Sequence, residues 1–415
     1  MIMESIKDLR KPELLVPAGS PEALRTAILY GADAVYIGGT NYGLRARAAN
    51  FDRDTMRESV AYAHAHGVRV HVTVNIIAHE DQLDGLEDYL LFLQSISVDA
   101  LIVADAGILS IAREVIPDME IHLSTQASAT NSRTMSFWHK QGVKRIVAAR
   151  EVSLDQLARI RSKVDPDLDI EAFVHGAMCM SISGRCLLSN YLAGRDANQG
   201  ACVHPCRWKY HLVEETRPGE YMPVFEGEEG TYIMNSKDLC MIEYLPQMIQ
   251  AGVISFKIEG RMKTPLYVAM TAKAYREAID DLFEDPALYE KKKPYYKELL
   301  SMVSHRDYST GFYLGDPDQN SYNYTSAEYQ KSAVFVGKVL SVGKDQTLVE
   351  QRNKFSVGDT VYLLAPKGEP IPVTVSSITD EEGKAQESAP HARQRVFVSL
   401  PQQAAEGMIL MKQMN

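Results

Sequence analysis

The stretch ELLVPAGSPEALRTAILYGADAVYIG, residues 13–38, contains an apolar run, a segment of helical period and a second apolar run. The two runs, Glu13–Pro17 and Ala34–Gly38, have the length and side chains of buried strands, and a glycine lies at or shortly after the end of each. A strand, a helix and a strand in this order predict a parallel sheet that is covered by helices.

The same arrangement recurs along the first two thirds of the chain. Segments such as Asp54–His66 and Asp81–Gln94 have apolar residues three and four apart, as in an amphipathic helix. The six further apolar runs are Arg69–Asn75, Ala100–Asp105, Glu120–Ser124, Arg145–Arg150, Ile170–Val174 and Ser255–Glu259. Eight strands alternating with helices predict the α/β class and a closed (β/α)8 TIM-like barrel. An open doubly wound sheet is the alternative, but no glycine-rich phosphate motif supports a nucleotide-binding fold.

Composition limits the class of protein. The 415 residues are 45% hydrophobic and 24% charged, which is typical of a folded protein, and the length predicts two or three domains. The charged N-terminal residues do not resemble a secretory signal, and no apolar run reaches the ~20 residues of a membrane helix. We therefore expect a cytoplasmic protein without a membrane partner. The net charge of −10 disfavours extensive wrapping of nucleic acid, although a local basic face remains compatible with it.

The chain divides into two predicted domains. We expect the barrel and its trailing helices, Pro265–Phe283 and Pro294–Val303, to occupy residues 1–325, and a small β-barrel to occupy residues 326–415. The small domain is predicted from short alternating strands at Val334–Leu340, Thr347–Glu350, Thr360–Leu364, Ile371–Ile378 and Arg395–Ser399. An insertion at about residues 177–250 separates the seventh and eighth barrel strands, and long insertions of this kind are usually functional.

All five cysteines of the chain lie in that insertion: Cys179, Cys186, Cys202, Cys206 and Cys240. Clustered cysteines in an intracellular protein more often bind metal or perform chemistry than form structural disulfides. No C-x2-C knuckle of the kind that zinc favours is present, whereas iron–sulfur clusters accept irregular spacing. The spacing therefore favours an iron–sulfur cluster, with zinc and free or redox thiols as the alternatives.

Active sites of β/α barrels lie at the C-terminal ends of the strands. Polar residues at these ends are our candidates: Asp105, His175 and Glu259 for catalysis, and Gln126 for substrate binding. Cationic residues follow the same ends, and guanidinium groups suit carboxylate or phosphate. We expect an anion-binding rim made by Arg45, Arg47, Arg150, Lys257 and Arg261. Lys257 has an alternative orientation into the barrel, because side chains alternate along a strand.

Protease motifs are missing from the sequence. His79-Glu80 lacks the second histidine of H-E-x-x-H, and there is no G-x-S-x-G elbow. A cysteine nucleophile assisted by His175 stays an alternative, since His175 precedes Cys179 by four residues. Trp208 beside Arg207 combines an aromatic ring with a cation, as RNA-binding surfaces do, and the alternative is a packed, structural Trp208.

Three blocks of the sequence resemble the collagenase-like peptidases of family U32. They are EAFVHGAMCMSISGRCLLS at 171–189, NSKDL at 235–239 and FKIEGRM at 256–262. The resemblance spans about residues 12–330, and the C-terminal region resembles the small domain of longer members. The segment RDANQGACVHPCRW at 195–208 is most similar to the branch of bacterial tRNA uridine hydroxylases.

That resemblance implies an enzyme that forms 5-hydroxyuridine at the wobble position in the anticodon loop of tRNA. It also implies prephenate, a small dicarboxylate, as co-substrate, which would suit the cationic rim. A 4Fe-4S cluster would be held by Cys179, Cys186, Cys202 and Cys206, with Cys240 as the rival of Cys206 for the fourth position. A cysteine-dependent peptidase and an RNA-binding protein with structural zinc remain the alternatives.

Overall fold

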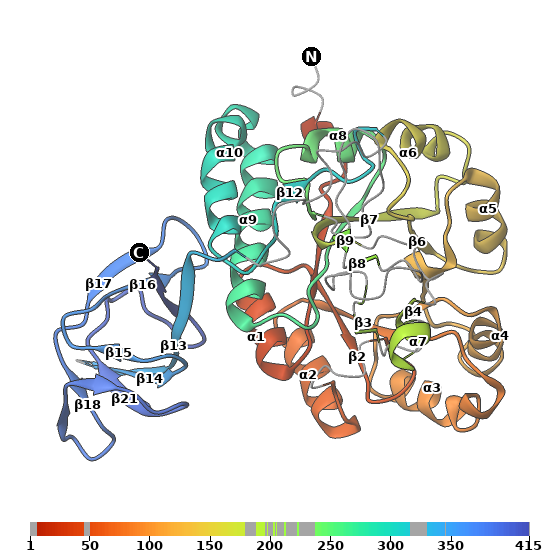
Figure 1. Cartoon of the computed structure of the whole chain (residues 1–415). Helices are drawn as coiled ribbons and strands as arrows, with labels where there is room; N and C mark the ends of the chain where they lie inside the picture. The colour runs from red at the N-terminus through yellow and green to blue at the C-terminus, as the bar shows by residue number, and fades with distance from the viewer. Residues whose placement is uncertain are drawn as a thin grey trace.

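A closed barrel of parallel strands dominates the computed structural model (Figure 1). The structure describes residues 6–44, 50–178, 188–195, 197, 202–203, 205, 211–212, 222–223, 237–315, 330–344 and 346–414. Within these residues the barrel strands are β1 (Glu13–Pro17), β2 (Ala34–Gly38), β3 (Arg69–Val74), β4 (Ala100–Val103), β5 (Ile121–Leu123), β6 (Arg145–Val147), β7 (Asp169–Ala177) and β11 (Ser255–Ile258). Each strand pairs with the next, and β11 pairs with both β7 and β1. The predicted eight-stranded TIM-like barrel is confirmed, and the open sheet is excluded.

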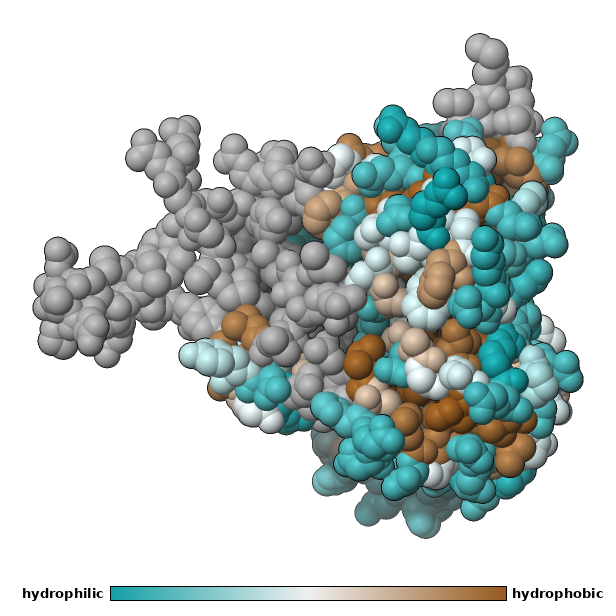
Figure 2. All heavy atoms as spheres, turned by 90° about the vertical axis from the view of Figure 1, so that its right-hand side faces the viewer, coloured by the Kyte–Doolittle hydropathy of each residue, from teal (hydrophilic) through white to brown (hydrophobic). Residues whose placement is uncertain are grey.

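Helices surround the barrel on the outside, as Figure 1 shows. They are α1 (Pro21–Leu29), α2 (Arg53–Ala65), α3 (Leu86–Ser95), α4 (Ala106–Val115), α5 (Ser132–Lys140), α6 (Leu154–Arg161), α8 (Leu245–Gln250), α9 (Pro265–Glu284) and α10 (Pro286–Ser301), with short 3-10 turns at Ile6–Asp8, Glu80–Gln82 and Thr125–Ala127. Polar caps such as Ser20, Asp52 and Thr264 accept a backbone N–H and start their helices. Figure 2 shows the side that carries α3 to α6, which is largely hydrophilic with apolar side chains gathered toward its lower part. No helix in the described ranges is both long and apolar enough for a bilayer.

The connection from β7 to β11 is only partly described. It includes α7 (Leu188–Ala193), β8 (His211–Leu212), β9 (Met222–Pro223) and β10 (Asp238–Cys240). Strand β10 runs antiparallel to the end of β7, with Cys240 opposite His175, and β12 (Tyr308–Ser309) pairs with β10. Most of the expected cysteine-rich insertion lies outside the described residues.

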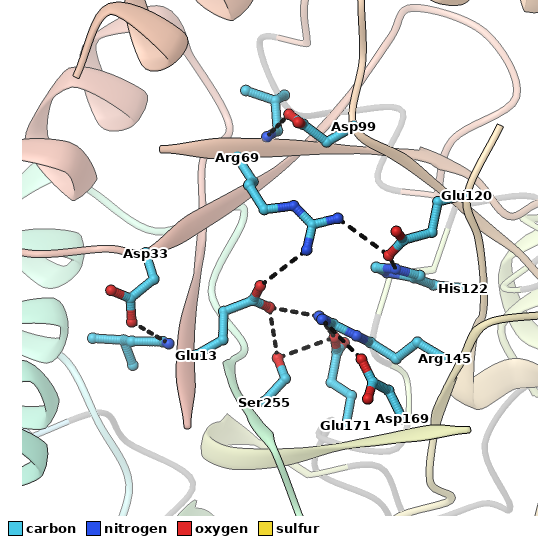
Figure 3. A network of polar contacts seen from close by, with 12 residues as sticks. Glu13, Asp33, Arg69, Asp99, Glu120, His122, Arg145, Asp169, Glu171 and Ser255 are labelled. Atoms are coloured by element: carbon cyan, nitrogen blue, oxygen red, sulfur yellow. Dashed lines mark hydrogen bonds and ion pairs between the residues drawn. The ribbon is translucent and has the colours of Figure 1, made fainter. Parts of the chain in front are cut away.

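A network of buried charges closes the N-terminal end of the barrel (Figure 3). Arg145, which is 1% exposed, places Nη1 2.5 Å from Glu13 Oε1 and 3.2 Å from Glu171 Oε2. Arg69 joins Glu13 to Glu120, at 3.6 and 3.1 Å. Charged groups in an interior are tolerated only when they are paired, and residues at this end of a β/α barrel serve stability. We therefore assign the network to folding.

The C-terminal part is an antiparallel half-barrel. Its strands are β13 (Ala333–Val342), β14 (Thr347–Gln351), β15 (Phe355–Ser356), β16 (Thr360–Leu364), β17 (Ile371–Thr374), β18 (Ile378–Thr379), β19 (Ala385–Gln386), β20 (Ser388–Ala389), β21 (Arg395–Val398) and β22 (Ile409–Gln413). Eight of them form a sheet in the order β17-β16-β22-β13-β14-β21-β18-β19. The predicted small β-barrel is corrected here to a half-barrel, since the described pairings leave β17 and β19 as edges. The sequence pattern missed β22 and merged β17 with β18, which join opposite sides of this sheet.

The half-barrel packs against α1, α9 and α10, as Figure 1 shows. Tyr30 Oη, just after α1, donates to Leu364 O at 2.7 Å and accepts from Ile409 N at 3.2 Å. Gly368 N donates to Glu277 Oε1 of α9 at 2.9 Å. Leu364 and Ile409 also belong to the same buried apolar cluster as the barrel helices. The shared core fixes the two parts relative to each other.

Candidate active site at the barrel mouth

We use the term mouth for the end of the barrel that is formed by the C-terminal ends of its strands. Three buried polar side chains lie there, where β3 and β5 end. Asn75 Nδ2 donates to Gln126 Oε1 at 2.9 Å, and Ser124 Oγ donates to the same oxygen at 3.3 Å. The backbone N–H of Leu44 donates to Asn75 Oδ1 at 3.2 Å, which ties the loop after β2 to this group. Each of the three side chains is at most 8% exposed. The mouth therefore has a fixed set of neutral amide and hydroxyl groups that suits hydrogen bonds to a polar ligand.

Arg261 reaches across the same end of the barrel from the loop after β11. Its Nη1 donates to Thr73 Oγ1 at 2.7 Å, and the residue is 5% exposed. A Cβ atom on Gly38 would lie 2.5 Å from Arg261 Nη1, and one on Gly19 would lie 2.0 Å from the Arg261 carbonyl oxygen. Glycine at the ends of β1 and β2 is thus required for the close approach of this arginine.

Arg150 follows β6 and is the second buried cation of the mouth. Its Nη1 donates to Ala177 O at 2.6 Å, its Cζ lies 4.0 Å from the Phe173 ring centroid, and its Nη2 is 3.8 Å from Glu259 Oε2. In the part of the chain that the structure describes, Arg150 Nε has no hydrogen-bond partner. Stacking and one strong hydrogen bond hold the guanidinium, while Glu259 remains close enough to balance its charge.

Two of the five cations of the expected rim, Arg150 and Arg261, therefore lie on mouth loops. Arg45 and Arg47 lie outside the described residues. Lys257 corrects the expectation, because its side chain points into the barrel interior: Nζ is 2.7 Å from Glu171 Oε1 and 4.7 Å from the Tyr36 ring centroid. Alternation along β11 turns Lys257 inward, and its charge is already neutralised by a buried carboxylate.

Asp105 has a structural role at the start of α4. Its Oδ1 accepts from the backbone N–H of Gly107 at 2.8 Å and of Ile108 at 3.0 Å. A carboxylate that caps a helix satisfies two otherwise unpaired donors and is favoured by the helix dipole. We therefore leave Asp105 out of the proposed catalytic groups.

His175 lies on the helix side of β7, among tyrosines. Its ring centroid is 5.5 Å from that of Tyr275 and 5.3 Å from that of Tyr308, and it is 1% exposed. Burial, together with His305 and Lys263, lowers the pKa of His175 to about 3. The pairing of β7 with β11 shifts by one residue between Phe173 and His175, and this bulge turns the imidazole away from the barrel axis. A neutral, packed histidine does not support the expected catalytic role.

We expect His175 to make the free energy of unfolding fall as the pH drops below about 6.5, the usual pKa of an unfolded histidine. The folded pKa is about 3, so the unfolded chain takes up a proton that the folded chain does not. Each pH unit within this window should cost about 1.4 kcal/mol. Urea unfolding of the wild type and of His175→Gln at pH 7, 6 and 5 tests this. Equal pH slopes for the two proteins would contradict the prediction.

Of the expected cluster ligands, the structure describes Cys202. Its side chain is half-buried, and the neighbouring Val203 N–H donates to Ser189 Oγ of α7 at 3.1 Å. Cys179, Cys186 and Cys206, like Arg207 and Trp208, lie outside the described residues. The described ranges hold no group of three or more His, Cys, Asp or Glu side chains arranged around one metal position.

Cys240 lies on β10, next to β7 in the sheet, and its side chain contacts Tyr275 of helix α9. Its Sγ is 3.9 Å from Tyr275 Oη, and burial raises the pKa of the thiol to about 11. The same tyrosine hydroxyl donates to Val174 O at 2.7 Å. Cys240 therefore shares the aromatic surroundings of His175.

Sequence reasoning missed Thr73 and the aromatic residues beside the mouth. Thr73 had one available signal, because it lies two residues before Asn75 and therefore on the same face of β3. The aromatic residues, among them Tyr42 and Tyr89, had no such signal, since they come from two different loops and helices. Only the folded loop after β2, which holds Tyr42 against the start of α3, brings them together.

A closed β/α barrel with buried arginines and amides at the C-terminal ends of its strands defines a barrel enzyme. The sequence model of peptidase family U32 matches residues 19–323, and that of the family's C-terminal domain matches residues 331–411. The chain belongs to peptidase family U32.

Its relatives define a branch of that family. The tRNA hydroxylation protein P1 of Bacillus subtilis is 42% identical over 393 residues, which cover 94% of this chain and 92% of that protein. The tRNA hydroxylation protein P of Escherichia coli is 40% identical over 439 residues and 94% of each chain. A 23S rRNA 5-hydroxycytidine synthase of Escherichia coli is 35% identical over 85% of this chain and 52% of its own length. The resemblance to the tRNA-hydroxylating branch is confirmed.

Proposed function

We propose that this enzyme converts the wobble uridine of tRNA to 5-hydroxyuridine, with prephenate as co-substrate and a 4Fe-4S cluster. The observation that carries the proposal is an identity of about 40% to tRNA hydroxylation proteins over 94% of the chain. The rRNA relative is named for a 5-hydroxylated pyrimidine as well, which supports the same kind of modification. Nucleoside analysis of tRNA from a strain that lacks this protein tests it, and unchanged 5-hydroxyuridine would contradict it.

The donor set fits such a cluster. Cys179, Cys186, Cys202 and Cys206 lie within 28 residues, and the first follows the end of β7, at the barrel mouth, by two residues. Four thiolates are the usual ligands of a 4Fe-4S cluster, which would supply electron transfer when bound. The packing of Cys240 against Tyr275 favours Cys206 as the fourth ligand. Iron and sulfide in protein purified without oxygen would support this assignment, and zinc would favour a structural metal site.

The small dicarboxylate is assigned to the mouth. Arg150 and Arg261 are buried cations with fixed positions there, and each has further N–H groups besides the one that bonds to Ala177 or Thr73. Gln126 and its partners would orient the polar groups of the ligand. Glu259, next to Arg150, stays our catalytic candidate.

We expect Arg261→Ala and Arg150→Ala each to weaken prephenate binding by about 1.5–3 kcal/mol, the usual cost of losing a charged hydrogen bond. Calorimetric titration measures the affinity. The matched control is Arg10→Ala, which removes an exposed guanidinium at the opposite end of the barrel and should leave the affinity unchanged. Wild-type affinity in both mouth variants would remove these arginines from the site.

RNA would bind through a limited surface. With a net charge of −10, the affinity has to come from local basic and aromatic groups, for which Arg207 and Trp208 are our candidates. The position of His175 gives the peptidase alternative no support, because a buried imidazole with a pKa of about 3 is a poor base for a thiol.

A further inference from the structure

A hollow of about 270 Å³ lies beside the mouth, between the first turns of α2 and α3. Four aromatic rings line it, from Tyr42, Phe51, Tyr89 and Phe92. Its lining residues follow β2 or β3 or lie in the first two turns of the next helix, so they lie toward the C-terminal ends of the barrel strands. The hollow therefore lies at the same end of the barrel as Arg150 and Arg261, and it is lined by other residues.

The rings form one packed set. The centroids of Tyr42 and Tyr89 are 5.2 Å apart with an angle of 32°, and Tyr89 stacks on Phe92 at 6.3 Å. Phe51, Tyr89 and Phe92 are at most 7% exposed, whereas Tyr42 is half-buried and is therefore the most exposed of the four rings. Within the described ranges the buried Tyr89 hydroxyl has no hydrogen-bond partner. An apolar floor with one half-exposed ring and an unused hydroxyl is suited to a planar polar ligand.

Tyr42 has an unfavourable backbone conformation. Its φ of 62° is in the left-handed region, which a bulky side chain rarely adopts. Two contacts keep it there: Tyr42 Oη donates to Asp84 O at 3.0 Å, and Ile76 N donates to Tyr42 O at 3.2 Å. Such conformations are concentrated at binding and catalytic sites, where the structure has to define one position of a side chain.

The charged residues that line the hollow disfavour anions, since there are two aspartates and one arginine among them. Asp84 and Asp88 are exposed carboxylates, and Arg53 pairs with Asp88. Burial and these two aspartates raise the pKa of Tyr42, as expected in a negative field. A dicarboxylate or a phosphate would be repelled, whereas a neutral ring with N–H donors would find acceptors.

We propose that this hollow binds an unpaired, amino-bearing nucleobase of the RNA substrate, adjacent to the nucleotide that is modified. The inference rests on the proposed function. Proteins recognise single-stranded RNA by stacking splayed bases on aromatic rings, and aspartate accepts from exocyclic amino groups. A hollow of about 270 Å³ is smaller than the pockets of roughly 300–1,000 Å³ that hold drug-sized ligands, so it suits a single ring system.

The test is the affinity of the purified enzyme for an anticodon stem-loop RNA, measured by fluorescence anisotropy. Stacking of one base is worth about 1–3 kcal/mol, so Tyr42→Ala should bind about 5–150-fold more weakly. Tyr42→Phe keeps the ring but loses the hydrogen bond to Asp84 O, and it should retain most of the affinity that Tyr42→Ala loses. The matched control is Tyr62→Ala on the same helix as Arg53, where Tyr62 contacts His66 far from the mouth and should not matter.

A second series leaves the protein unchanged and removes one base of the loop at a time. An abasic site next to the modified nucleotide should weaken RNA binding to the wild-type enzyme by the same factor as Tyr42→Ala does. The same abasic RNA should bind to Tyr42→Ala as tightly as the intact RNA does, because the stacking contact is already lost. Replacing an amino-bearing base by uracil at that position should weaken binding to the wild type but not to Asp84→Asn/Asp88→Asn. This inference alone would be overturned if the wild type and Tyr42→Ala bound the stem-loop RNA equally and no abasic position weakened binding to the wild type. A wild-type enzyme that binds no stem-loop would overturn it together with the proposed function.

Discussion

Cys179→Ala should abolish 5-hydroxyuridine in the tRNA of cells that contain no other copy of this protein. Cys179 follows the end of β7 by two residues and is the proposed ligand that enters the mouth region first along the chain. The proposed 4Fe-4S cluster would lose one of its four thiolate ligands in this variant, and the redox chemistry that depends on the cluster should be lost with it. Nucleoside analysis of bulk tRNA measures the outcome.

Two cysteine variants serve as matched controls. Cys240→Ala removes a thiol that packs against Tyr275 and should leave both the iron content and 5-hydroxyuridine close to wild type. Cys206→Ala should behave like Cys179→Ala. The reverse pattern, with cluster loss in Cys240→Ala and retention in Cys206→Ala, would assign the fourth ligand to Cys240. Normal 5-hydroxyuridine with Cys179→Ala would overturn the hydroxylase proposal, and proteolysis that disappears in this variant would favour a cysteine peptidase.

Arg145→Met should lower the free energy of unfolding by about 3–5 kcal/mol, the usual cost of breaking a buried ion pair from one side. Its guanidinium contacts Glu13 and Glu171 inside the closed end of the barrel (Figure 3). Burial alone would raise the pKa of Glu171, but Lys257 and Arg145 outweigh it and lower the value to about 2. Without Arg145, the buried carboxylate of Glu171 and the largely buried carboxylate of Glu13 each lose one cationic partner, which makes their charged forms costly.

Urea unfolding with native tryptophan fluorescence or circular dichroism measures this loss. Arg10→Ala is the matched control, because Arg10 contacts Asp169 of the same network at 3.4 Å but its side chain is 65% exposed. An exposed ion pair is worth about 0–1 kcal/mol, so this control should be close to wild type. A loss below about 1 kcal/mol in Arg145→Met would mean that solvent reaches the network.

The barrel could be predicted from the sequence because its signals are local. Each strand is a short apolar run, each helix has a period of 3.6, and residues such as Ser20 and Asp52 mark where helices begin. The half-barrel was predicted less well for the same reason. Strand β22 lies between β13 and β16 in the sheet. It follows β13 by about 70 residues in the sequence, and no local pattern predicts a pairing over that distance.

The sequence did not predict the direction of every side chain on and after the barrel strands. His175 follows the end of one predicted strand, and Lys257 lies within another, Ser255–Glu259. His175 faces the tyrosines of the helix side, whereas Lys257 faces the barrel interior. Strict alternation predicts the direction of Lys257, but the bulge in β7 reverses that of His175. A bulge depends on the pairing of two distant strands, so it is decided by tertiary structure.

The sequence by itself determined the barrel, the order of its strands, the five cysteines and the similarity to family U32, because apolar period and residue identity are properties of the chain. Tertiary structure alone decided which polar groups meet at the mouth. Arg261 reaches Thr73 across 188 positions of the sequence, and Tyr42 of the loop after β2 meets Tyr89 of α3. Contacts between such distant segments form only when the barrel closes, since closure brings the ends of all eight strands to one face.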